Sequence, residues 1–66
     1  MQVWIIETGR YYDNHTWTTS VHKSRISAER KCVKDGFLLD PEQYVYLNDK
    51  EHMYRKIAGP FEMEDK

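Results

Sequence analysis

The chain has 66 residues and a net charge of −1, so it forms one small domain with a thin core and lacks the cationic excess that favours general nucleic-acid binding. Its single cysteine, Cys32, excludes an intramolecular disulfide and indicates a reducing compartment, so we expect a cytoplasmic protein. The N-terminal apolar run, residues 3–6, is too short for a signal peptide or a membrane span, so we expect no membrane partner.

The N-terminal part of the chain predicts a β-hairpin. Residues 3–7 (VWIIE) are apolar on both alternating faces, which is typical of a strand covered on both sides. Residues 16–21 alternate and are rich in β-branched side chains, which predicts a strand with one face in water. Asp13 and Asn14 supply turn chemistry between the strands. We interpret the tyrosines, histidines and tryptophan of residues 10–24 as mostly structural parts of this hairpin.

A short helix follows the hairpin. Ser24 is a favourable N-cap, and residues 25–35 predict a helix that ends at Gly36. With successive side chains about 100° apart, one narrow apolar stripe is predicted to face the sheet. That stripe consists of Ile26, Val33 and Phe37, with Ala28 and Cys32 at its edge. The helix is too short to be stable without packing against the sheet.

The second half of the chain predicts another hairpin. Asp40-Pro41 interrupts the chain before two extended segments, residues 44–47 and residues 51–58. Gly59-Pro60 is predicted to end the second of these strands. Residues 61–66 are predicted to form a frayed acidic tail.

Together these elements predict a single α+β domain over residues 1–66. The expected order is ββαββ, with an antiparallel sheet and one short helix packed on one of its faces. If the turn keeps the register, alternation in the second hairpin places four apolar side chains on the helix-facing side: Val45, Leu47, Met53 and Ile57.

The opposite face of the predicted sheet carries the candidate partner-binding residues. They are rings of the second hairpin and one ring of the first strand: Tyr44, Tyr46, His52, Tyr54 and Trp4. Because a monomer rarely leaves so much aromatic surface bare, either a host protein or a second copy, in a homodimer, would cover it. Alternatively, the tyrosines lie over the open sheet and complete the thin core. The sequence leaves both readings open.

A second candidate surface is basic. Cations concentrate in the region of the predicted helix: Lys23, Arg25, Arg30, Lys31 and Lys34. Together with exposed tyrosines that could stack on bases, they make single-stranded nucleic-acid binding the alternative function. A basic outer helix face is more often only solvated, so nucleic acid ranks below a protein as the expected partner.

The sequence gives little support to a catalytic or a metal-binding function. The potential metal ligands match no compact ligand spacing: His15, His22, Cys32 and His52. Cys32 lies in the middle of the predicted helix, where no helix N-terminus stabilises a thiolate. The isolated glycines form no phosphate-binding loop. We therefore expect no metal, no cofactor and no enzymatic activity.

The segments VWIIETGRYYDN and SVHKSRISAERK resemble the first half of small phage and prophage accessory proteins. The shared pattern begins with an apolar strand that ends near Glu7 and a tyrosine- and aspartate-rich turn at residues 11–13. A second strand through Val21 then leads to a short helix with Ser24 at its start and Ala28 in its second turn. The resemblance implies a small accessory protein without an assigned activity. We therefore predict a phage-encoded, protein-binding modulator or inhibitor of a host factor, such as a defence protein.

Overall fold

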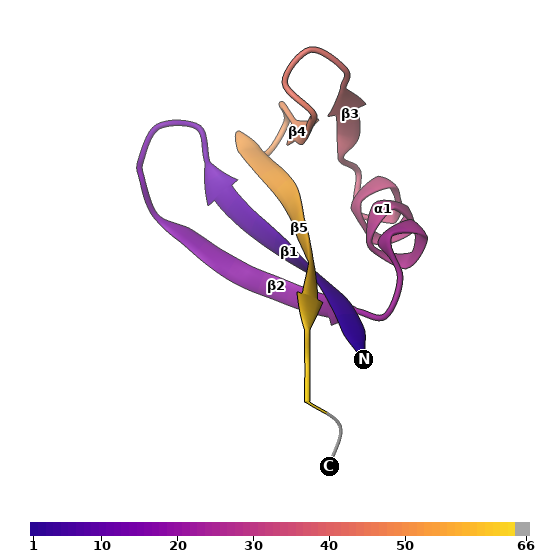
Figure 1. The fold of residues 1–66 in the computed structure, drawn as a ribbon. Coiled ribbons are helices and arrows are strands. Elements are labelled where there is room, and N and C mark those ends of the chain that lie inside the picture. The colour runs from indigo at the N-terminus through magenta and orange to yellow at the C-terminus, as the bar shows by residue number, and fades with distance from the viewer. Residues whose placement is uncertain (65–66) are drawn as a thin grey trace.

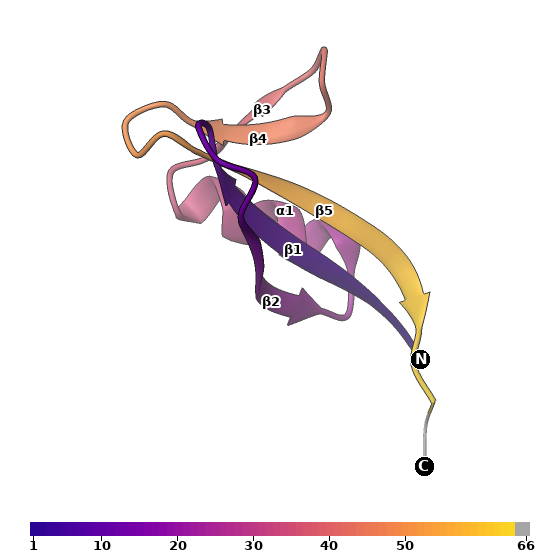
Figure 2. The same ribbon diagram turned by 90° about the vertical axis from the view of Figure 1, so that its left-hand side faces the viewer.

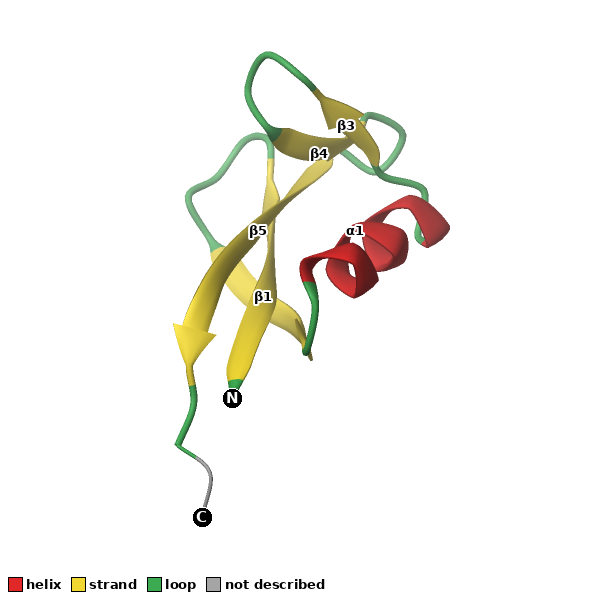
Figure 3. Ribbon diagram, turned by 45° about the vertical axis from the view of Figure 1, so that its right-hand side comes forward, coloured by secondary structure: helices red, strands yellow, loops and turns green. Residues whose placement is uncertain are grey.

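The computed structural model describes residues 1–64, which form one five-stranded antiparallel sheet with a single helix (Figure 1). This confirms the predicted α+β class with one short helix on an antiparallel sheet. The elements in chain order are β1 (Gln2–Arg10), β2 (Thr16–His22), α1 (Arg25–Lys34), β3 (Leu38–Asp40), β4 (Val45–Asn48) and β5 (Met53–Glu62). The strand order across the sheet is β2-β1-β5-β4-β3. Figures 2 and 3 show that α1 lies on one side of the sheet.

The predicted order ββαββ is wrong by one strand, because a short strand, β3, separates the helix from the second hairpin. In β3, Leu39 pairs with Tyr46 and Leu38 pairs with Leu47, so β3 forms the outer edge of the sheet. Three residues are too few to show a period of two in the sequence. The segment therefore reads as a connection before Pro41 rather than as a strand.

The strand β5 continues through Gly59-Pro60, where the sequence predicts its end. The pairing with β1 shifts register at this point, and Val3 pairs with Phe61 beyond the irregularity. Gly59 has φ 136°, and a Cβ at this position would lie 2.9 Å from the Val3 carbonyl oxygen. The missing side chain thus lets the two backbones meet, and the bulge absorbs the extra residue without ending the strand.

The prediction of a frayed tail over residues 61–66 is also wrong for its first two residues. Phe61 and Glu62 belong to β5, and Glu62 pairs with Gln2. The amide of Met63 donates to the carbonyl of Met1 at 2.7 Å, which extends the pairing past the strand. Residues 65–66, the end of the predicted tail, lie outside the described residues.

The helix begins as predicted, because the Ser24 hydroxyl accepts a hydrogen bond from the Ser27 amide at 3.1 Å. Its buried face differs from the prediction. Ala28 and Cys32, four residues apart, are fully buried, whereas Ile26 and Val33 are 60% and 56% exposed. Two small residues on the inner face let the helix lie close to a sheet that already presents large side chains. The helix residues of the predicted stripe, Ile26 and Val33, are therefore largely exposed to solvent rather than buried against the sheet.

The core lies between α1 and the sheet. Its buried members are Ile6, Ala28, Cys32, Phe37 and Tyr46, and Met53 and Ile57 pack against them. The predictions for Phe37, Met53 and Ile57 are thus confirmed.

The predicted register between the two strands of the second hairpin is wrong by one residue. Asn48 pairs with Met53 across a four-residue loop, so Tyr46 stands opposite Arg55 and Leu47 opposite Tyr54. Cross-strand partners share a face, and a one-residue change exchanges the two faces. Leu47 therefore lies on the side away from the helix, and Tyr46 lies beneath the helix.

Candidate functional site

The tyrosines predicted to share one exposed face do not share it. Tyr46 is 7% exposed and belongs to the core. Tyr54 lies on the opposite face of the sheet, because its cross-strand partner is Leu47. Tyr44 is 79% exposed and lies before β4 with φ 56°, outside the alternation of the strand. The predicted aromatic face is therefore not formed as such.

Trp4 and His52, the other predicted partner-binding residues, lie in two further places. Trp4 is half-buried on β1 and pairs with His22 of β2. His52 is the last residue of the turn between β4 and β5, and its ring centroid lies 6.1 Å from that of Tyr11 and 6.0 Å from that of Tyr12. These contacts join the two loops at one end of the sheet, in agreement with the structural interpretation of the first hairpin.

The side chain of Tyr54 covers part of the sheet face that the helix leaves open. A Cβ on Gly9 would lie 2.5 Å from the Tyr54 Cζ atom, so the ring rests directly over the glycine. The Lys56 ammonium lies 5.7 Å from the centroid of the same ring. Tyr54 thus completes the structure of this face, as in the second of the two readings of the sequence.

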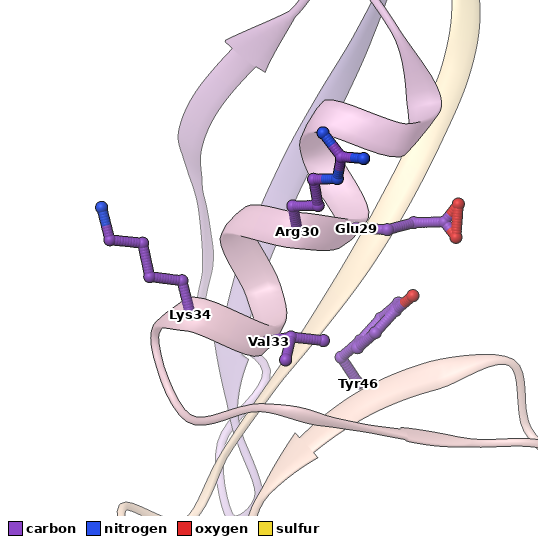
Figure 4. Close-up of a pocket in the computed structure, with 5 residues that line it drawn as sticks. All are labelled: Glu29, Arg30, Val33, Lys34 and Tyr46. Carbon is purple, nitrogen blue, oxygen red and sulfur yellow. The ribbon is translucent and has the colours of Figure 1, made fainter.

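A groove of about 500 Å³ lies between α1 and β4 (Figure 4). Its lining consists of Glu29, Arg30, Val33, Lys34 and Tyr46. Val33 points toward the ring of Tyr46, and the Glu29 carboxylate lies on the same side as the Tyr46 hydroxyl. Burial, followed by the negative charge of Glu29, raises the pKa of Tyr46, so its hydroxyl stays protonated at neutral pH.

Three exposed apolar side chains lie on the helix side of the molecule, and one of them lines this groove. Val33 lines it and is 56% exposed, and Ile26 lies two turns earlier on the same helix stripe with 60% of its surface exposed. Leu39 is 50% exposed and pairs with Tyr46, so both side chains lie on the helix side of the sheet. We define the helix-side surface as Ile26, Glu29, Arg30, Val33, Lys34, Leu39 and Tyr46.

The predicted basic residues divide into two groups. Lys31 contacts Asp35 at 3.2 Å and is therefore engaged within the fold. Within residues 1–64, the structure shows no ion pair for the other four, namely Lys23, Arg25, Arg30 and Lys34. Two of these unpaired cations, Arg30 and Lys34, line the groove.

Cys32 and the histidines have local roles in the described part of the chain. Burial raises the pKa of the Cys32 thiol, so the group stays protonated within the core. The imidazole of His22 contacts the hydroxyls of Ser20 and Ser27, each at 2.8 Å. In residues 1–64, no group of three or more His, Cys, Asp or Glu side chains is arranged to hold a metal ion.

A buried charge network behind the groove escaped the sequence analysis. Arg55 is 9% exposed and donates to Asp35 Oδ2 at 2.8 Å and to Thr8 Oγ1 at 3.2 Å. Its guanidinium carbon lies 4.2 Å from the centroid of the Phe37 ring. The hydrogen bond from Arg55 lowers the pKa of Asp35. A single arginine in a strand gives no sequence signal of burial, because arginine is usually exposed.

The chain matches no protein-family model, no curated protein and no solved structure. Within the described residues, no helix has the length and apolar character needed to cross a membrane.

Proposed function

We propose that the chain is a non-enzymatic protein-binding module whose helix-side surface docks on a host protein. The observation that carries this proposal is the set of exposed apolar side chains beside the groove. Ile26, Val33 and Leu39 are each half exposed or more. Val33 lines the groove with Tyr46, and Leu39 pairs with Tyr46 across the sheet. Apolar side chains grouped on one face of a small domain are typical of an interaction site.

The composition of the surface also favours a protein partner. An interface commonly has an apolar centre and a polar rim. Here the apolar centre is Val33 beside the largely buried ring of Tyr46, and the charged residues Glu29, Arg30 and Lys34 belong to the same groove. The opposite face offers less for a partner, because the ring of Tyr54 already covers part of it.

The resemblance of the first half of the chain to phage and prophage accessory proteins supports a more specific role. On this basis the module is a phage-encoded modulator or inhibitor of a host factor, such as a defence protein, and it acts in the host cytoplasm. Such a protein works by occupying its target in a stoichiometric complex, which requires a binding surface and no catalytic group.

Single-stranded nucleic acid is the second candidate partner. The cations on and before α1 that have no ion pair within residues 1–64 favour it, since such side chains contact phosphates. The expected stacking platform is weaker than predicted, because Tyr46 lies in the core and Tyr54 lies on the opposite face from α1. A protein partner therefore remains the first proposal.

Affinity capture from host lysate, with and without nuclease, tests these two candidates. Val33→Glu alters the groove, and Val21→Glu is a matched control, because Val33 and Val21 are 56% and 57% exposed. We expect a nuclease-resistant protein that the wild type and Val21→Glu capture and Val33→Glu loses. Loss of all capture after nuclease would favour nucleic acid. Equal capture by both variants would contradict binding through the helix-side surface.

A further inference from the structure

We propose that two copies of the chain associate reciprocally, with the end of β5 from each copy seated on the helix-side surface of the other. We define the β5 end as residues 61–64, which are Phe61, Glu62, Met63 and Glu64. This inference goes beyond the binding of a host protein and does not depend on it. It rests on the matching chemistry of two regions that the fold holds apart.

The receiving groove combines apolar walls with positive charge. Val33 and Tyr46 face each other across it, and Arg30 and Lys34 project from the adjacent turns of α1 (Figure 4). Neither cation has an ion-pair partner among residues 1–64. The long side chains of these cations reach beyond the groove, so they can meet carboxylates on the outer side of a segment that fills it. The fitting ligand is therefore an extended segment with apolar side chains and neighbouring carboxylates.

The β5 end has this composition. Phe61 and Met63 are 46% and 48% exposed, which leaves two large apolar side chains in water. Glu62 and Glu64 alternate with them, so an extended backbone presents apolar side chains on one face and carboxylates on the other. The Glu62 carboxylate contacts the N-terminal ammonium at 3.1 Å, but its side chain is 72% exposed and stays accessible.

The segment cannot reach the groove of its own copy. Phe61 is paired with Val3, and Met63 is hydrogen-bonded to Met1, so both are fixed at the far end of the sheet. Tyr46 stands opposite Arg55, which lies six residues earlier on β5, or roughly 20 Å away along the strand. Figures 1 and 3 show this end of the chain extending away from α1 and β4.

A second copy can supply the segment. In a twofold arrangement each copy gives its β5 end and receives the partner's, so one association forms two equal contacts. The attraction is electrostatic at the rim and apolar at the centre. Reversing the charge on either side should therefore weaken both contacts at once, and restoring complementarity should recover both.

Sedimentation equilibrium on paired charge-reversal variants tests the proposal. One variant carries Arg30→Glu and Lys34→Glu, and the other carries Glu62→Lys and Glu64→Lys. Over concentrations from about 10 μM to about 1 mM, the wild type should shift from the monomer mass of 8.0 kDa towards twice that value. Each variant alone should dissociate at least about tenfold more readily. An equimolar mixture of the two should associate again, because every groove then meets an oppositely charged segment.

Several outcomes would overturn the proposal: a wild type that stays monomeric throughout this range, or variants that still associate alone or stay monomeric when mixed. Circular dichroism checks that each variant is folded. Lys56→Glu, a charge reversal on the open sheet face, is a control for position and should associate like the wild type. The lysate capture separates the two proposals, since the variant with Glu62→Lys and Glu64→Lys keeps the groove and should still bind the host protein.

Discussion

Replacing Arg55 with methionine should destabilise the domain by about 2–4 kcal/mol. Removing one member of a buried ion pair costs roughly 3–5 kcal/mol. That cost is reduced here, because Asp35 is 27% exposed and keeps its contact with Lys31 at 3.2 Å. The lost hydrogen bond to Thr8 and the lost contact with the Phe37 ring each account for about 1 kcal/mol of the total. Methionine retains the apolar stem, so the change isolates the guanidinium.

Denaturant unfolding of a double-mutant cycle is the assay. Arg55→Met, Asp35→Asn and the double variant should be strongly non-additive, because Asp35→Asn removes the carboxylate charge that Arg55→Met leaves without its guanidinium partner. The folded-state pKa of Asp35 is lowered, so its contribution is complete above the unfolded pKa of about 3.9 and is lost as pH falls through the folded value. The cost of Arg55→Met should therefore shrink in acid. A cost below about 0.5 kcal/mol at neutral pH would refute this reasoning.

Two further predictions concern packing and a tyrosine. Ile6→Ala should cost about 2–5 kcal/mol in unfolding free energy, because Ile6 is fully buried, whereas Ile26→Ala should cost under about 1 kcal/mol. Equal costs in thermal and denaturant unfolding would contradict the exposed position of Ile26. Tyr11 should titrate spectroscopically near 12, since burial and its 2.7 Å hydrogen bond to Asp49 raise its pKa, and Asp49→Asn should lower that value. Stability from this raised pKa is complete below pH about 10 and is lost as pH rises through the folded value; a tyrosine titration that Asp49→Asn leaves unchanged would contradict the assignment.

Local signals in the sequence were sufficient for the fold class and for the start of the helix. Ser24 accepts the capping hydrogen bond that its position predicts, and Gly36 with φ 92° follows the helix as expected. These predictions hold because they depend on a few neighbouring residues. The short strand β3 gave no such signal, since its pairing with β4 is visible only in the folded sheet.

The buried face of the helix could not be predicted from the helix alone. Ile26 and Val33 are the most hydrophobic residues of α1, and hydrophobicity placed them inward. The structure buries the smaller Ala28 and Cys32, because the space beneath α1 is filled by residues from distant parts of the chain, including Tyr46. Helix orientation is thus set by the volume of the sheet residues, which the helix sequence does not contain.

The candidate site depended on that orientation and on one turn length. The four-residue loop between Asn48 and Met53 exchanges the faces of the second hairpin and moves Tyr46 under the helix. The outward turn of α1 leaves Val33 exposed beside Tyr46 and so creates the groove. A one-residue difference in strand register and a rotation of the helix are both small changes, but each decides which side chains meet.

Amide chemical shifts measured during a titration with the captured host protein test the central claim most directly. If the helix-side surface is the interface, the largest changes should occur at Ile26, Val33 and Leu39, and residues on the opposite face, such as Val21 and Tyr54, should change little. Changes confined to Val21 and Tyr54, with the helix-side residues unaffected, would contradict the proposed binding surface.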